Sequence, residues 1–235
     1  TFAAPTSISN GVNVGVRAFI GFGNTTSSQQ VDFYRVGGGL RGDFIVPGWR
    51  YDLFVGSSWS DANYTFQSFL TDRIAKSLNV VSNGNGGFNC VSAATGCVAA
   101  PVLTPAVVSG ALPQNYIDYI LQDVTGNTKY QEQVVNLSLD GKLFSLPYGD
   151  VQAAIGFEYR HNHINDTPPI DSQNSNLYNL TSAGITIGSD AVKEAYGELE
   201  IPLLRNLPFA QDLTLNISGR ATDYRSYGSD YTYKI

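Results

Sequence analysis

The chain of 235 residues contains no methionine and no long apolar run. Its nearest approach to such a run, residues 97–113, is interrupted by Pro101, Pro105 and Pro113. A membrane-spanning helix needs about 20 consecutive apolar residues, so the sequence excludes one. The start also lacks a signal peptide, so no leader gives the destination of the chain. Because the chain begins at Thr1 and has no methionine, we expect a processed or partial product.

Charged residues are scarce as well. They make up 14% of the sequence, against about 25% in an ordinary soluble domain. The formal net charge is −6, which argues against a nucleic-acid partner, because phosphate backbones attract basic proteins. Glycine, with 24 residues, and tyrosine, with 14, are plentiful. The composition therefore predicts a protein that binds no nucleic acid.

The only two cysteines are Cys90 and Cys97, in the segment FNCVSAATGCVAA. Six residues separate them, and most of these are small. Such spacing is typical of a disulfide-closed loop formed in an oxidising compartment. A metal site would need further ligands nearby, and the segment offers none. We predict a disulfide, with two unpaired thiols as the alternative.

Apolar and polar residues alternate in many parts of the chain. Successive side chains of a strand point to opposite faces, so such alternation predicts strands with one apolar and one polar face. In one example, Leu213, Leu215 and Ile217 alternate with Thr214 and Asn216. Eight segments show the pattern: 12–22, 34–44, 51–59, 135–143, 151–159, 195–203, 213–221 and a start at 231–233. Local periodicity alone fits both a β-sandwich and a membrane barrel.

The connections between these segments alternate between short and long. Short, proline-containing turns are predicted at 45–49, 144–150 and 204–210, since proline ends a strand and suits a turn. The segments 63–127 and 163–190 are long and rich in small or polar residues. Short turns on one side and long loops on the other are typical of a bacterial transmembrane barrel. This pattern favours the barrel over the sandwich.

Strand length and aromatic placement point the same way. Each run has roughly the 9–11 residues that cross a bilayer in a tilted strand. Aromatic residues gather at the ends of the runs, in the manner of interfacial girdles: Trp49, Tyr51, Phe144, Tyr148 and Phe209 at one end, and Trp59, Tyr64, Phe66, Tyr159, Tyr224 and Tyr227 at the other. We therefore expect the apolar rows to face lipid and the polar rows to face a wet or protein-filled lumen.

Several segments resemble TonB-dependent outer-membrane receptors. They are FYRVGGGLRGDF (33–44), GWRYDLFVGSSWSDANY (48–64), DVQAAIGFEYRHN (150–162) and VKEAYGELEIPLLRNLPFAQDLTLNISGRATDYRSYG (192–228). The last contains a Pro-Leu-Leu turn and a strand ending in an Arg-x-x-Asp-Tyr pattern, here Arg220, Asp223 and Tyr224. The loop with the two cysteines also resembles a loop of this family. The resemblance runs from about Val12 to Lys234 and is carried by the order of the motifs.

The resemblance implies a plugged barrel of about 22 strands in the bacterial outer membrane. It implies import of a scarce nutrient, such as a siderophore, cobalamin or oligosaccharide, with energy from the TonB complex. The family binds its ligand between extracellular loops and the plug. Here we count about eight strands, and no plug precedes Thr1. We expect residues 1–235 to be a middle portion of the barrel, with extracellular loops near 63–127 and 163–190.

Candidate site residues follow from the expected outer side of the barrel. As ligand-facing residues we predict Tyr116, Arg160, His161, His163, Tyr224 and Arg225. His161 and His163 lie two apart and share one face of a continuous strand, where a metal-bound ligand or plain solvent would meet them. We predict no catalytic residue, no bound metal and no cofactor. A short helix is expected within 115–124, where Tyr116, Tyr119 and Ile120 have helical spacing.

Charged residues of the polar rows have a structural interpretation. Glu194, Glu198 and Glu200 share one face, and paired carboxylates can perform acid/base chemistry, but the sequence offers no dry pocket. Hydrogen bonding between barrel wall and plug is the preferred role, also for Arg160 and Arg220. The glycines of GGGLRG (37–42) do not precede a helix, so they are not a phosphate-binding loop.

Two other functions are compatible with the sequence. One is a small barrel of about eight strands that acts as a passive pore or adhesin. The other is a soluble β-sandwich that binds a ligand. The long loops argue against the sandwich, and the chain end at Ile235, which reads as the middle of a strand, argues against the small barrel.

Overall fold

The structure is a computed structural model and describes residues 23–92 and 96–235. Most of this part of the chain forms antiparallel strands, so the all-β class predicted from the sequence is confirmed. The chain divides into two compact units. The sheet unit comprises residues 31–62, 128–166 and 186–235. The helical unit comprises the described residues of 23–30, 63–127 and 167–185.

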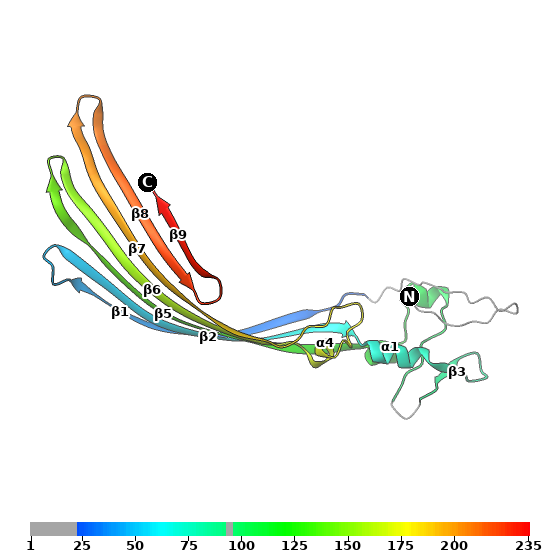
Figure 1. Cartoon of the computed structure of the whole chain (residues 1–235). Coiled ribbons are helices and arrows are strands. Elements are labelled where there is room, and N and C mark those ends of the chain that lie inside the picture. The colour runs from blue at the N-terminus through cyan, green and yellow to red at the C-terminus, as the bar shows by residue number, and fades with distance from the viewer. Residues whose placement is uncertain (1–22, 93–95) are drawn as a thin grey trace. The chain divides into compact units, whose positions relative to one another are not determined.

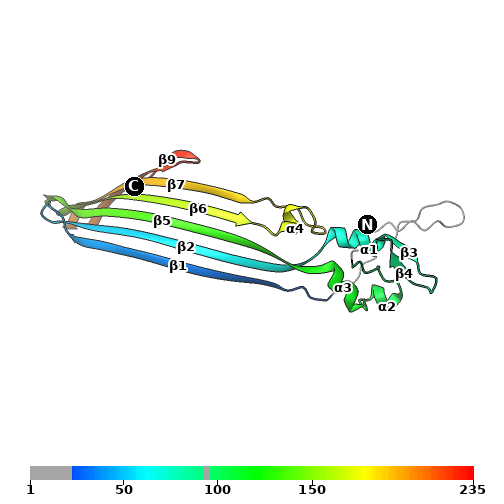
Figure 2. The same ribbon diagram turned by 90° about the horizontal axis from the view of Figure 1, so that it is seen from below.

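Seven strands lie side by side in one sheet, in the order β1-β2-β5-β6-β7-β8-β9 (Figures 1 and 2). Their bounds are β1 Ser27–Asp43, β2 Trp49–Phe69, β5 Leu121–Leu146, β6 Gly149–Thr167, β7 Thr186–Leu207, β8 Ala210–Tyr224 and β9 Gly228–Lys234. The sheet is open within the described residues, because β1 and β9 each pair with one neighbour only. The sheet itself curves, as Figure 1 shows.

The connections alternate in length as the sequence predicts. Residues 44–48, 147–148 and 208–209 close three tight hairpins at one end of the sheet unit. In the last of these, Pro208 precedes Phe209, whose φ of 73° is the left-handed conformation that a type II turn requires. The opposite strand ends are joined by the long connections 70–120 and 168–185 and by a three-residue turn at 225–227.

The strands confirm seven of the eight predicted segments, and the eighth, 12–22, lies outside the described residues. Each long strand extends beyond its predicted run. For example, β5 covers Leu121–Leu146, whereas alternation marks only 135–143. The additional residues are largely polar, so strand pairing rather than an apolar face holds them extended. Their side chains bond to each other between strands, as Thr128 does to Asp166 at 2.5 Å.

One predicted row is wrong at its end. The sequence places Leu203 on the apolar row of 195–203, but the pairing of β7 with β8 shifts between Pro202 and Leu204. Leu204, and not Leu203, lies opposite Leu213. Proline lacks the N–H that the ladder needs, so a bulge at this position is the expected accommodation.

The helical unit contains four short helices and a small hairpin. They are α1 Thr71–Leu78, α2 Pro105–Val108, α3 Gln114–Ile120 and α4 Ile170–Gln173, with β3 Val80–Ser82 paired to β4 Phe88–Cys90. Helix α3 confirms the short helix predicted within 115–124, although it ends where β5 begins. The described residues of the segment 63–127 thus contain more regular structure than the composition suggests.

Two small apolar clusters hold the helical unit together. Ile74, Tyr116 and Ile120 form one, with Phe69 and other half-buried side chains packed around them. The second consists of Leu70, Val124 and Leu177, with Phe66 against it. Backbone bonds tie the segments as well: the amide of Leu70 donates to the Ile120 carbonyl, and that of Thr71 to the Asn176 carbonyl. The connection 168–185 therefore folds against the connection 70–120.

The predicted disulfide is present and joins Cys90 to Cys97. Its first cysteine ends β4, and its second precedes the segment that packs Val98 and Ala100 on the Ile74 cluster. Closing the loop restricts the unfolded chain and so stabilises the folded one. The disulfide therefore fixes the β3–β4 hairpin to the core of the helical unit.

Candidate functional site

One face of the sheet unit carries small and apolar side chains from β6 to β9. Ile155 lies opposite Gly197, Gly197 opposite Gly219, and Gly219 opposite Tyr233. The next row outward consists of Phe157, Ala195, Ala221 and Tyr231. Because the pairing of β6 with β7 is continuous, the alternation seen in each strand is in phase across the sheet. We call this side the apolar face.

Large side chains of the apolar face are exposed. Ile155 has an exposed fraction of 48% and Phe157 of 44%. The same holds for other predicted apolar rows, whose exposed members are Tyr34, Val36, Leu40, Val55, Trp59, Leu137, Leu143 and Leu213. The described residues therefore leave the apolar face uncovered, which differs from a soluble sandwich with an internal core.

The opposite side, the polar face, carries the charged rows. Glu158 on β6 lies opposite Glu194 on β7, which lies opposite Thr222 on β8. Like charges directly opposite each other destabilise a sheet. Here Arg220 forms an ion pair with Glu194 at 3.1 Å, and Arg160 lies 3.6 Å from Glu158. Each carboxylate thus has its own guanidinium, which compensates their mutual repulsion.

Further contacts join the polar face into a network. Asn136 donates to Glu158 across β5 and β6 at 3.2 Å, and Arg50 bonds to Asp140 across β2 and β5 at 3.0 Å. The Arg220 guanidinium also lies 5.5 Å from the centre of the Tyr196 ring. Glycine makes room for such rings: a Cβ at Gly156 would lie 2.2 Å from the Tyr196 ring. Many of the groups on the polar face are therefore paired with one another.

A shallow polar groove of about 400 Å³ runs along β7, β8 and β9 on this side. It is lined by Tyr196, Gly197, Glu198, Ser218, Gly219, Arg220, Thr232, Tyr233 and Lys234. Its carboxylate, guanidinium, ammonium and hydroxyl groups can bind a polar ligand or the backbone of another polypeptide.

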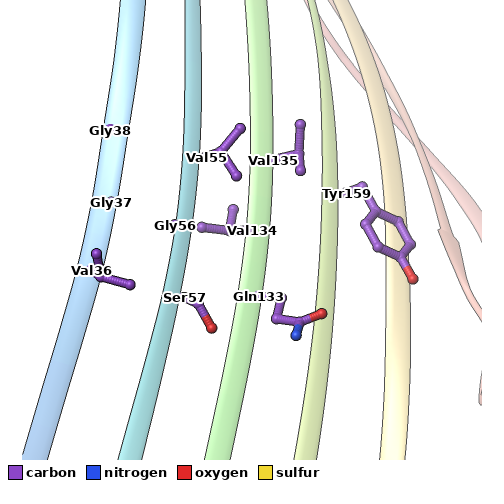
Figure 3. Close-up of a pocket in the computed structure, with 10 residues that line it drawn as sticks. All are labelled: Val36, Gly37, Gly38, Val55, Gly56, Ser57, Gln133, Val134, Val135 and Tyr159. Atoms are coloured by element: carbon purple, nitrogen blue, oxygen red, sulfur yellow. The ribbon is translucent and has the colours of Figure 1, made fainter.

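A second groove, of about 550 Å³, lies across β1, β2, β5 and β6 (Figure 3). Val36, Val55, Val134 and Val135 come from three neighbouring strands and give it an apolar lining. Val36, Ser57 and Gln133 lie at its end toward the long connections, and Tyr159 comes from the next strand, β6. Gly37, Gly38 and Gly56 lie in the same region, and a Cβ at Gly38 would meet no neighbour within 4 Å.

Five of the six predicted ligand-facing residues lie at the same end of the sheet unit, but on two faces. Arg160 and Tyr224 share a row of the polar face, because both lie opposite Val192. His161 lies opposite Ala191 and His163 opposite Ser189, which places both on the side of Ile155 and Phe157. The histidines share one face, as their spacing predicts, and it is the apolar one.

Arg225 has a structural partner in the turn 225–227. Its guanidinium donates to the backbone carbonyl and to the hydroxyl of Ser189. Ser226 donates to Asp190 at 2.5 Å, and the ring of Tyr224 lies 5.4 Å from that of Tyr227. These bonds fix the β8–β9 turn against β7. Tyr227 remains exposed and available to a ligand.

Tyr116 lies in the helical unit and is 8% exposed. It packs with Ile74 and Ile120, and its hydroxyl shares a hydrogen bond with Ser77 at 3.3 Å. Burial raises the pKa of the Tyr116 phenol, because the charged form would lose its water. The structure gives this side chain a place in a core, away from solvent.

Two buried polar atoms of the described residues have no hydrogen-bond partner: Nε of Arg160 and Oδ1 of Asn162. They belong to the same row of β6, two residues apart, on the polar face. An unsatisfied buried group costs about 1–3 kcal/mol. The N–H of Arg160 Nε and the Oδ1 of Asn162 are therefore a neighbouring donor and acceptor that could bind a group from outside the described residues.

Expected girdle residues divide between the faces and units. Trp49, Tyr51, Trp59 and Tyr159 occupy positions in phase with the apolar rows. Tyr224 lies on the polar face, and Phe66 packs in a core of the helical unit. The sequence shows where aromatic residues gather along a strand. It identifies their face only when the odd and even positions are separated.

Sequence reasoning did not single out Asn162 and Lys193. Asn162 follows Arg160 by two residues, so the period of a strand would have grouped them. Lys193 lies opposite Tyr159 on the apolar face, and this pairing is visible only in the register. In the described part of the chain, no three His, Cys, Asp or Glu side chains converge on a possible metal position. Nor do the described helices include one long and apolar enough to cross a membrane.

No known protein family matches the sequence, and no curated protein shows significant similarity to it. The functional argument therefore rests on the two faces of the sheet, their grooves and their connections.

Proposed function

We propose that this chain is part of a transmembrane β-barrel of the bacterial outer membrane, with the apolar face toward lipid and the polar face toward the lumen. Within that barrel, it serves a TonB-dependent transporter of about 22 strands that imports a scarce nutrient. The plug and the TonB complex are its partners. A siderophore, cobalamin or an oligosaccharide is its ligand class.

The observation that carries the proposal is the register of β6, β7, β8 and β9. It aligns the apolar positions of four strands into one exposed face and most of their charged positions into the other, with Lys193 and Asp223 on the apolar face only toward its end at the long connections. A sheet exposed to water on both sides would place charged groups along the whole length of each face. Lipid on one side and a polar lumen on the other give each face a suitable solvent.

The separation of the two tryptophans along β2 can be compared with the thickness of a membrane. Trp49 and Trp59 lie ten residues apart on the same face of β2. Ten residues of strand span about 33 Å. With a strand tilt of about 40°, this corresponds to about 25 Å along the membrane normal, which matches the height of a barrel's apolar band. The two indoles therefore fit the two interfacial levels.

The polar face supports the transport part of the proposal. Ligands and plug segments in a barrel meet the lumenal wall, where the groove near Arg220 offers charged and hydroxyl groups. Arg160 and Asn162 add an unpaired donor and an unpaired acceptor. We assign Arg160 and Tyr224 to contacts with the plug or ligand, since both lie on this face.

Tryptophan quenching by brominated lipids tests the orientation without any substitution. The full chain is reconstituted in bilayers whose acyl chains carry bromine either near the ester end or near the methyl end. Both tryptophans are expected to be quenched more strongly by the shallow bromine, and weakly by aqueous iodide. Variants Trp49→Phe and Trp59→Phe report the two levels separately.

Strong iodide quenching of both indoles, with no response to brominated lipid, would refute the membrane assignment and favour the soluble sandwich. Quenching of only one indole would refute the proposed two-level placement on β2.

The mass of the native protein tests the transporter assignment. The chain of 25.4 kDa accounts for part of a plugged barrel of about 22 strands. Denatured protein from a detergent-extracted outer-membrane fraction is expected to have about three to four times this mass. A mass near 25.4 kDa would contradict the transporter and leave the small passive pore.

A further inference from the structure

Three hydrogen-bond donors border the apolar face where β6 and β7 approach the long connections. His161 and His163 follow Tyr159 at alternate positions of β6, and Lys193 lies directly opposite Tyr159 on β7. We call His161, His163 and Lys193 the donor rim. All three lie on the same face as Ile155 and Phe157. They are farther along β6 and β7 toward the long connection between these strands. The rim thus stands where the apolar face gives way to polar residues.

The donor rim has no partner within the part of the chain that the structure describes. The two imidazoles and the Lys193 ammonium make no hydrogen bond and no ion pair there. The polar face behaves differently, because Arg50 and Arg220 are paired with carboxylates at 3.0 and 3.1 Å. These two lumen-side guanidinium groups are therefore paired, whereas the rim donors are available.

Two carboxylates on the same side are engaged by other groups. Asp223 lies opposite Lys193 on β8 and accepts a hydrogen bond from Ser229 at 2.8 Å. Asp61 lies 3.7 Å from Lys129. Since the formal net charge of the chain is −6, this gathering of basic side chains is a local exception. It is complementary to an anion.

The groove of Figure 3 adjoins the donor rim. Tyr159 lines the groove and also lies opposite Lys193, so one residue borders both. Beside its valines, the groove has Ser57 and Gln133 at its end toward the long connections, which is the direction in which His161 and His163 follow Tyr159. A groove lined largely by valines and glycines that adjoins polar and cationic groups has the polarity of an amphiphile with an anionic head.

We propose that this surface binds a phosphate-bearing lipid, with the phosphate on the donor rim and an acyl chain in the groove. This inference rests on the proposed function, because it requires the apolar face to meet lipid. Imidazole and ammonium groups are N–H donors suited to phosphate oxygens, and charge-assisted bonds of this kind are among the stronger ones. The valines of the groove provide contacts that a free phosphate would not use.

Native mass spectrometry of the detergent-solubilised full chain tests the site. Phosphatidic acid is compared with diacylglycerol of identical acyl chains and with glycerol 3-phosphate, which lacks the chains. Phosphatidic acid is expected to bind at least about tenfold more tightly than either, since each lacks one half of the recognised structure.

Two variants separate the halves of the site. The double variant His161→Gln/Lys193→Gln is expected to lose the preference for phosphatidic acid over diacylglycerol. Gly38→Leu fills the groove, and its Cβ would meet open space, so it is expected to weaken phosphatidic acid about tenfold without disturbing the fold. Lys142→Gln is the matched control, because Lys142 pairs with Asp150 near the 147–148 turn.

Equal preference in the double variant and the unchanged chain would overturn the inference. So would glycerol 3-phosphate binding as tightly as phosphatidic acid, which would indicate a free-phosphate site instead. Tryptophan quenching is measured after the same preparation has been reconstituted into bilayers of brominated lipid. Lipid quenching without a preference for phosphatidic acid would refute the lipid site alone, whereas absent lipid quenching would refute the membrane assignment itself.

Discussion

Replacement of Ile155 by arginine is expected to destabilise the bilayer-inserted chain by about 2–4 kcal/mol, the cost of a cation on the lipid side of a barrel strand. Ile155 lies on the apolar face opposite Gly197, between the tight turns and the donor rim. Its side chain is 48% exposed, so in water the same substitution would be nearly neutral. The size of the destabilisation therefore depends on the solvent that this face meets.

Gln152→Arg is the matched control on the same strand. Gln152 lies opposite Glu200 on the polar face, where an added guanidinium finds a carboxylate. Reversible urea unfolding of both variants in lipid vesicles provides the comparison. If Ile155→Arg and Gln152→Arg unfold at the same urea concentration as the unchanged chain, the apolar face does not contact lipid.

Replacement of Ile120 by alanine is expected to cost the helical unit about 2–5 kcal/mol of local stability. Ile120 is 2% exposed and packs with Ile74 and Tyr116, so truncation leaves a cavity in a small core. Its carbonyl also accepts the bond from Leu70 at the beginning of α1. Amide hydrogen exchange of Ile74, which donates to the Leu70 carbonyl, is expected to accelerate accordingly.

Ile170→Ala controls for the loss of an isoleucine as such, because Ile170 is 65% exposed. It is expected to change the exchange of Ile74 by no more than about 0.5 kcal/mol. Unchanged protection in Ile120→Ala would mean that the Ile74 cluster contributes little to the helical unit, and that the disulfide or strand pairing holds it instead.

Alternation was a sound guide to the sheet because the two faces of each strand meet different surroundings. The rows of 151–159 and 213–221 coincide with positions that the register aligns across β6, β7 and β8. Alternation gives no strand signal where a strand continues through polar residues, as in the first part of β5. There the contacts that hold the strand, such as Asn127 with Asn63, come from partners 64 residues away.

The helices of the connection 70–120 were harder to predict. Pro105 and Pro113 interrupt an apolar segment and indicate breaks. In the structure, Pro105 begins α2 and Pro113 precedes α3, both of which are positions that proline tolerates. Thr104 caps α2 through its side chain, a signal present in the sequence. Helices this short depend on tertiary contacts, which a single sequence does not display.

The sequence predicted where along the strands the candidate site lies. It did not predict how the site residues divide between the two faces of the sheet. Arg160, His161 and His163 do lie together near the strand end, but adjacent positions of a strand serve opposite sides. Tyr116 shows another limit, since its helical spacing is compatible with both a lid and a core. Its burial against Ile74 comes from a segment about forty residues away, and no local pattern reveals that.

The uninterrupted register from Gln152 to Asp166 has a consequence for insertions and deletions. One added residue within this stretch would move every following side chain of β6 to the opposite face of the sheet. Charged side chains would then meet the surroundings of the apolar face, and apolar side chains those of the polar face. We therefore expect homologous sequences to have insertions and deletions only between the strands, above all at 174–184. A reporter peptide inserted next to Gly184, where a Cβ meets no neighbour, would be accommodated for the same reason.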